Sequence, residues 1–131
     1  MRNYRNLLVW EKAHRLTLSI YKSTATFPGE ERFGLTSQMR RAAASIPANL
    51  AEGCGRRSDK EMARFVQIAM GSGAELSYHI LLARDLNFLD AKTHERLEAD
   101  LAVIMRMMSS LSQKLKASDA ESKISVVAIR G

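Results

Sequence analysis

The sequence contains few of the residues that interrupt helices. It has two prolines and seven glycines in 131 residues, so few turns and few elements are expected. Aromatic residues make up only 6% of the chain, and good helix formers such as Ala, Leu, Arg and Glu are abundant. Alternation of period two is missing until the C-terminal segment. The composition therefore predicts an all-α protein.

The sequence also lacks the marks of secretion and of membrane insertion. A single cysteine, Cys54, excludes an internal disulfide bond, which fits a reducing compartment. No apolar run reaches the roughly 18 residues that a membrane span needs, and the N-terminal segment has no signal-peptide core. These absences predict a soluble cytoplasmic protein with no membrane partner.

Acidic residues are scarce in the first half of the chain. The formal net charge is +6, and residues 1–64 carry twelve Lys or Arg against six Asp or Glu. Residues 65–131 carry eight of each sign, so the basic excess lies entirely in the first half. Such asymmetry favours an anionic partner such as nucleic acid, and an ordinary solvated surface is the alternative.

Apolar residues recur at helical spacing in four segments. The expected helices cover about residues 8–26, 36–54, 59–86 and 91–117. Ser58 and Asp90 are expected to cap the last two, and Phe27 and Phe33 to pack the first connection onto the bundle. Short connections make successive helices antiparallel, which predicts an up-down-up-down four-helix bundle over residues 1–117. Residues 118–131 are expected to form a disordered or loosely packed tail.

The expected third helix contains a stretch of small residues. Its predicted core face consists of Met62, Phe65, Ala69, Ser72, Leu76, Ile80 and Ala83. Glycines 71 and 73 flank Ser72 and are costly inside a helix, so they indicate that another backbone comes close. The expected neighbour is the small-residue face of the second helix.

The segment Gln38–Arg57 has the most unusual composition in the chain. Pro47 lies inside the expected second helix, where it removes a donor and frees the carbonyl of Ala43, and a kink is predicted there. A polar flank borders the core face, and an amide such as Asn49 could satisfy the freed carbonyl. Glu52 is expected to pair with Arg41, Arg56 or an arginine of another subunit.

A structural network or a subunit contact is the preferred role of this polar group, with ligand contact as the alternative. Its members are Gln38, Asn49, Glu52 and Glu75. Trp10, His14 and Tyr21 form a second stripe on the first helix, about 110° from its core face. They predict an oligomer interface, since aromatic residues are enriched there, or else packing at the edge of the same core.

Six basic residues are candidates for binding nucleic acid: Arg40, Arg41, Arg56, Arg57, Lys60 and Arg64. The start of the third helix lies among them, and its backbone donors and dipole favour phosphate. No zinc finger, aromatic RNA-binding pair or helix-turn-helix is apparent. Any binding is therefore expected to involve the nucleic-acid backbone and to depend on salt.

The sequence does not support a metal site or a catalytic centre. Glu11 and His14 form the only Glu-x-x-His match, and Glu11 lies opposite the core face. His79 follows Glu75 without a second histidine, and Cys54 has no histidine nearby in the sequence. No metal, no cofactor and no enzymatic activity are therefore expected.

Several motifs between about residues 7 and 90 are typical of one family. They are Val9-Trp10-Glu11-Lys12-Ala13, Phe27-Pro28, Phe33-Gly34-Leu35-Thr36-Ser37-Gln38, Arg40-Arg41-Ala42-Ala43, Ser45-Ile46-Pro47-Ala48-Asn49-Leu50-Ala51-Glu52-Gly53, Gly71-Ser72 and Glu75-Leu76. The chain thereby resembles the proteins encoded by intervening sequences in bacterial 23S ribosomal RNA genes. Leu50, where isoleucine is frequent, and Cys54 are mild departures.

The resemblance implies a four-helix bundle that assembles as a homopentamer. A more distant similarity, to the accessory protein of diversity-generating retroelements, implies a basic pentamer that binds nucleic acid. The expected function is thus a homo-oligomeric protein that binds RNA or RNA/DNA. A protein–protein assembly or adaptor module with no nucleic-acid role is the alternative.

Overall fold

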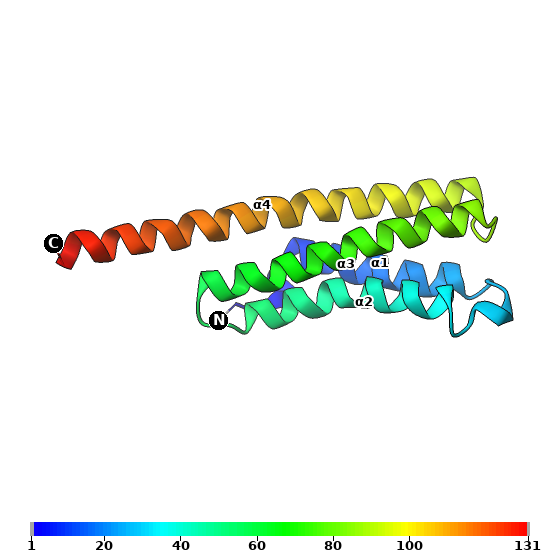
Figure 1. Cartoon of the computed structure of the whole chain (residues 1–131), viewed down its shortest axis with the longest axis horizontal. Helices are drawn as coiled ribbons and strands as arrows, with labels where there is room; N and C mark the ends of the chain where they lie inside the picture. The colour runs from blue at the N-terminus through cyan, green and yellow to red at the C-terminus, as the bar shows by residue number, and fades with distance from the viewer. Residues whose placement is uncertain (1, 131) are drawn as a thin grey trace.

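The computed structural model describes residues 2–130, with side chains described as far as Ile124. Its elements are η1 (Tyr4–Asn6), α1 (Leu8–Thr24), η2 (Gly29–Glu31), α2 (Leu35–Cys54), α3 (Asp59–Asp85) and α4 (Ala91–Arg130). The four α-helices lie side by side along one axis (Figure 1). No strand occurs in residues 2–130. The predicted all-α fold with four helices is confirmed.

The helices pack in a cyclic order around one core. Helix α2 lies against α1 and α3, and α4 lies against α3 and α1. Within the described part of the chain, no contacts join the diagonal pairs α1 and α3 or α2 and α4. The face formed by α1 and α2 therefore lies on the opposite side of the bundle from the face formed by α3 and α4.

The core face of α3 differs from the prediction at two positions. The apolar faces of α1 and α2 are buried, from Val9 to Ile20 and from Leu35 to Gly53. In α3 the buried line passes through Val66 and Gly73, whereas Phe65 and Ser72 are only half-buried and border α2. A helix turns about 100° per residue, so an error of one position moves a side chain to the neighbouring interface.

Local hydrogen bonds define the ends of α3 and the start of α4. Ser58 Oγ accepts from the N–H of Glu61 at 3.1 Å, and Asp90 Oδ1 accepts from the N–H of Thr93 at 2.7 Å. Both predicted caps are confirmed. Asn87 ends α3 with a φ of 63°, the left-handed conformation that closes many helix C-termini.

Helix α4 continues well beyond its predicted end. It reaches Arg130 and extends past the other three helices in Figure 1. The predicted end at residue 117 is therefore too early, because the helix continues through residues 118–130; Gly131 lies outside the described residues. Residues 91–130 contain neither glycine nor proline, so nothing in the backbone stops the helix. Asp119 and Lys123 add an ion pair at 3.4 Å with favourable spacing.

Helix α2 runs through Pro47, and the predicted kink stays a prediction. Because Pro47 has no N–H, the carbonyl of Ala43 loses its usual helical donor. The hydroxyl of Thr17 on α1 lies 3.1 Å from this oxygen and 2.9 Å from the carbonyl of Ala13, so its single proton is shared between the two acceptors. Asn49 instead donates to the carbonyl of Ser45 at 2.8 Å, so it is not the partner of the Ala43 carbonyl that the sequence offered.

Candidate nucleic-acid interface

The turn between α2 and α3 brings several predicted basic residues together. It is tight because Gly53 lets the end of α2 approach α3: a Cβ at this position would lie 3.0 Å from the Cβ of Phe65. Residues 55–58 then connect the helices, and the Ser58 cap starts α3. Arg56 and Arg57 are therefore held within a short, well-defined turn.

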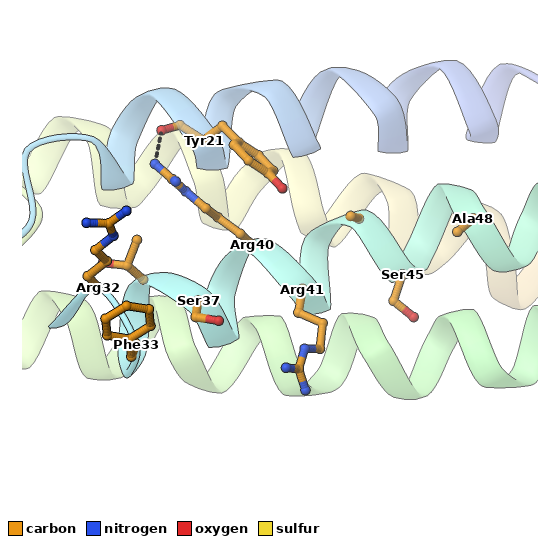
Figure 2. A pocket seen from close by; sticks show the side chains of 10 residues that line it. Tyr21, Arg32, Phe33, Ser37, Arg40, Arg41, Ser45 and Ala48 are labelled. Atoms are coloured by element: carbon orange, nitrogen blue, oxygen red, sulfur yellow. Dashed lines mark hydrogen bonds between the residues drawn. The ribbon is translucent and has the colours of Figure 1, made fainter.

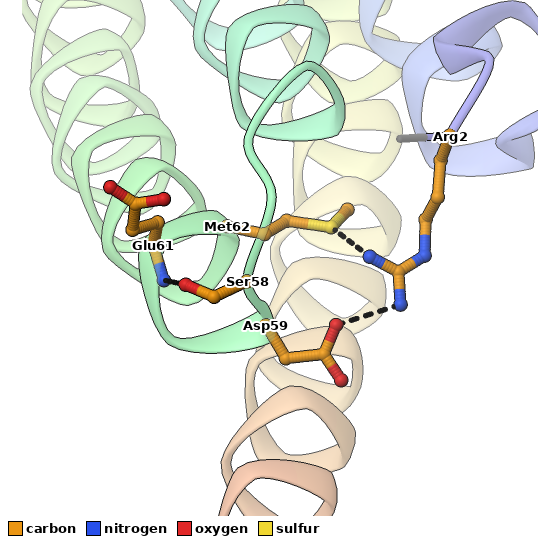
Figure 3. Close-up of polar contacts among 5 residues, drawn as sticks. All are labelled: Arg2, Ser58, Asp59, Glu61 and Met62. Atoms are coloured by element: carbon orange, nitrogen blue, oxygen red, sulfur yellow. Dashed lines mark hydrogen bonds and ion pairs between the residues drawn. The ribbon is translucent and has the colours of Figure 1, made fainter.

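Arg2, which the sequence did not single out, closes this turn from the N-terminal segment (Figure 3). Its N–H donates to the carbonyl of Cys54 at 2.9 Å, and its guanidinium pairs with Asp59 at 2.9 Å. Hydrogen bonds from Ser118 and Arg2 hold the pKa of Asp59 below its ordinary value of 3.8. The acidic residue nearest the turn is thus already paired inside the chain.

Burial governs the chemistry of the only cysteine. The side chain of Cys54 is buried, and burial raises the pKa of its thiol, with the charge of Arg2 opposing this effect. The opposing charge comes from the N-terminal segment rather than from the arginines that follow Cys54 in the sequence. The thiol is therefore protonated at neutral pH and shielded from reagents.

Basic side chains from three parts of the chain surround this turn. Arg56 pairs with Glu52 at 2.9 Å and lies over the ring of Phe65, 4.7 Å from its centroid. The guanidinium of Arg64 lies 5.6 Å from the same ring centroid. Arg57 and Lys60 are exposed and make no ion pair within the described residues.

Lys116 on α4 completes the group. With Lys60 and Arg64 it lines a shallow groove of about 230 Å³, in which Asp119 is the one acidic side chain. We call the set of Arg56, Arg57, Lys60, Arg64 and Lys116 the basic corner. The sequence indicated the first four, but Lys116 is about 50 residues away and joins them only because α4 runs antiparallel to α3.

Arg40 and Arg41 lie near the opposite end of α2. Arg40 donates to the hydroxyl of Thr24 at 2.9 Å and to the carbonyl of Tyr21 at 3.2 Å, and it lies over the Tyr21 ring. It therefore fastens the end of α1 to α2. Arg41 is exposed on the outer side of α2. The structure does not bring these two arginines to the basic corner.

A wide open groove of about 670 Å³ lies over α2 beside them, with Tyr21 as its lining residue from α1 (Figure 2). We call it the α1–α2 groove; it is lined by Tyr21, Arg32, Phe33, Thr36, Ser37, Arg40, Arg41, Ala44, Ser45 and Ala48. All its charged lining side chains are arginines. Phe33 is 89% exposed, so the expectation that it packs onto the bundle was wrong, whereas Phe27 is buried and contacts Phe88.

The predicted polar group is only partly connected. Asn49 donates to Ser45 Oγ at 3.0 Å, and Ser45 Oγ lies 2.8 Å from Ser72 Oγ on α3, so these residues link the two helices. Glu52 pairs with Arg56, one of the predicted partners. Glu75 lies 4.0 Å from His79, and Gln38 is exposed without a hydrogen bond among the described side chains.

The aromatic stripe of α1 is divided between the core and the surface. The Trp10 ring stacks on His14, with centroids 5.2 Å apart, and meets Tyr4 of η1 edge-on at 4.8 Å. Trp10 is half-buried against the core, in line with the alternative of edge packing. His14 is exposed, and Tyr21 is 46% exposed beneath Arg40. The outer part of this stripe remains available for an interface.

No described set of three His, Cys, Asp or Glu side chains is arranged to hold a metal ion. Glu11 pairs with Arg15 at 2.8 Å. Among the described helices, none is both long and apolar enough to cross a membrane.

The fold and the site define a small antiparallel four-helix-bundle protein with a cluster of cations at one end. The chain belongs to the 23S rRNA-intervening sequence protein family, whose model matches residues 5–110. No curated protein matches it significantly. The second resemblance, to the retroelement accessory protein, stays an expectation.

A solved structure from Bacteroides thetaiotaomicron, described as a protein of unknown function from the S23 ribosomal protein family, is similar in fold. The TM-score is 0.73 at 21% identity, over 80% of this chain and 98% of the other. At this identity the likeness supports the bundle fold alone.

Proposed function

We propose that this protein is a non-enzymatic, cytoplasmic homo-oligomer that binds the backbone of RNA or RNA/DNA through its basic corner. The observation that carries the proposal is the gathering of Arg57, Lys60, Arg64 and Lys116 around the start of α3. The number of copies implied by the resemblance is five.

The chemistry of the corner suits phosphate. Arg57 and Lys60 make no ion pair within the described residues. The nearby Asp59 is paired with Arg2, and Asp119 of the groove that Lys60 lines is paired with Lys123. The first turn of α3 adds the positive end of a helix dipole. Arg56 and Arg64 lie over Phe65, which orients their guanidinium groups beside the turn. Nothing in this arrangement reads base edges, so binding should tolerate sequence changes.

Binding of a structured RNA measured across a salt series tests this proposal. The affinity should fall steeply between about 50 and 300 mM salt, because each neutralised phosphate releases counterions. The double variant Arg57→Ala with Lys60→Ala should bind more weakly, and its salt slope should shrink by about two. Both side chains are exposed, so the thermal unfolding midpoint should not change.

The matched control is Lys12→Ala with Lys22→Ala, which removes the same charge from exposed positions on α1. Its affinity should stay near that of the unmodified protein. An equal loss in both double variants would show that net charge, rather than the corner, drives binding. No binding at low salt, or a flat salt response, would contradict the proposal and favour the adaptor module.

A further inference from the structure

Two open grooves lie on different sides of the bundle and carry opposite charge. The α1–α2 groove has a volume of about 670 Å³, and arginines are its charged lining residues. The second, the α3–α4 groove, has a volume of about 740 Å³, and Glu95 and Glu98 are its charged lining residues. The first groove lies over α2 and the second between α3 and α4, so the two grooves occupy different sides of the bundle.

The α3–α4 groove is lined mainly by small side chains. Its lining consists of Gly73, Ala74, Ser77, Glu95, Glu98, Ala99, Leu101, Ala102 and Met105. Gly73 packs against Met105, since a Cβ there would lie 2.4 Å from the Met105 sulfur, whereas Gly71 faces open space. The small stretch of α3 therefore approaches α4 as well as α2, and it leaves a shallow surface that another helix can approach closely.

Phe33 projects from the rim of the α1–α2 groove. Its 89% exposure is unusual for an aromatic residue, and Arg32 lies over its ring at 5.5 Å. In Figure 2, Phe33 lies just before the start of α2, and Arg41 and Ser45 follow along that helix on the side toward α3. An apolar knob with flanking cations is complementary to a shallow groove of small residues with flanking carboxylates.

The two grooves also lie at the same level along the bundle axis. Ser45 lines the first groove and lies 2.8 Å from Ser72, the neighbour of Gly73 in the second groove. A copy docked groove to groove with its bundle axis parallel to the first therefore needs a rotation and little translation along the axis. Repeated rotation without translation closes a ring rather than extending a filament.

We propose that the α1–α2 groove of one copy of this chain docks on the α3–α4 groove of a second copy. The contact is head-to-tail, because the two copies use different surfaces. Phe33 enters the small-residue groove, and Arg32 and Arg41 face Glu95 and Glu98. This inference rests on the proposed homo-oligomer and names the surfaces that form it. It also places every basic corner at the same end of the assembly.

Two surface variants test the contact. Phe33→Ser with Arg41→Ser disables the first groove without adding acidic groups that could pair with the other variant, and Glu95→Arg with Ala102→Arg disables the second. All four positions are exposed in the single chain, so circular dichroism should show an unchanged fold. Glu98 is left intact because its carboxylate lies 3.6 Å from the buried His94. By sedimentation velocity, each variant alone should be a monomer where the unmodified protein is an oligomer.

An equimolar mixture of the two variants gives the decisive result. The first variant retains an intact α3–α4 groove, and the second retains an intact α1–α2 groove. One molecule of each can therefore pair, and the mixture should form a dimer and nothing larger. Lys12→Glu, a charge reversal on the face between α1 and α4, is the control and should keep the full oligomer mass.

Contrary outcomes separate this inference from the proposed function. If the unmodified protein is an oligomer and either groove variant stays one, the groove contact is wrong and the oligomer stands. If the mixture remains monomeric, or forms species larger than dimers, the head-to-tail arrangement is wrong. If the unmodified protein is a monomer at micromolar concentration, both the groove contact and the oligomer are wrong. RNA binding by the basic corner is then still tested separately by the salt series.

Discussion

Thr17 compensates for a defect that Pro47 introduces in a different helix. Its hydroxyl lies 2.9 Å from the carbonyl of Ala13 in its own helix and 3.1 Å from the carbonyl of Ala43 in α2. The second oxygen is buried and has no backbone donor because residue 47 is proline. A single hydroxyl thus supplies a hydrogen bond that the backbone of α2 cannot make, and it fixes α1 against α2 at that level.

We predict that Thr17→Val lowers the free energy of unfolding by about 1–3 kcal/mol, because a buried acceptor loses its donor without loss of volume. Pro47→Ala restores a backbone N–H opposite the same carbonyl. In that background the cost of Thr17→Val should fall by about 1 kcal/mol, which a double-mutant cycle by urea unfolding measures.

Thr26→Val is the matched control for this cycle. Its hydroxyl is exposed and reaches only the carbonyl of Ser23, at 3.5 Å, so its effect should stay below about 0.5 kcal/mol. An identical cost of Thr17→Val with proline or alanine at position 47 would show that the Ala43 carbonyl is not the source.

At the scale of elements, α4 consists of two parts: one packs against the other helices and one extends beyond them. Up to Leu115 it contributes buried side chains to the core, among them Leu97, Ile104 and Met108. From Glu121 to Ile124 the side chains are exposed, and Figure 1 shows the helix extending beyond the bundle. An unsupported helical segment of this length is only marginally stable in water. The outer part should therefore contribute helix content and little stability.

Truncation tests this division of α4. Ending the chain after Ala120 should change the free energy of unfolding by less than about 0.5 kcal/mol while lowering the helical signal in circular dichroism. Ending it after Lys114 also removes Leu115, which is 4% exposed, and should cost about 2–5 kcal/mol. Comparable losses from both truncations would mean that the outer part stabilises the bundle.

At the scale of the whole molecule, seven of the twelve basic residues in the first half gather at two sites. One group of arginines lines the α1–α2 groove, and the other belongs to the basic corner, at opposite ends of α2. We assign the groove to contact with a second copy and the corner to nucleic acid. If copies assemble through the grooves, each corner repeats at one end, and weak phosphate contacts add through multivalency.

The link between assembly and RNA binding predicts an effect on RNA affinity that is opposite to the effect expected from net charge alone. The variant Glu95→Arg with Ala102→Arg makes the chain more basic, yet it should bind RNA at least about tenfold more weakly because its corners act singly. Fluorescence anisotropy against salt would also show a smaller slope, since fewer phosphates are neutralised per complex. Tighter binding by this variant would show that charge outweighs multivalency.

The helices and their caps could be predicted because their signals are local. The periodicity from Val9 to Ile20 and the side chains of Ser58 and Asp90 act within a turn or two of helix. The same local logic failed for α3, where one step in helix rotation put Val66 and Gly73 in the core instead of Phe65 and Ser72. It also failed at the end of α4, where an apolar segment without a partner was expected to be disordered.

The sequence by itself determined the fold class, the number of helices, the uneven charge and the basic turn at Arg56 and Arg57. These properties follow from composition and from spacing along one chain. Only the tertiary structure decided that the Thr17 hydroxyl lies against the carbonyl of Ala43, that Lys116 joins the basic corner and that Phe33 is exposed. Each of these depends on the rotation and register of one helix against another, which are set by packing across the core and leave no local trace in the sequence.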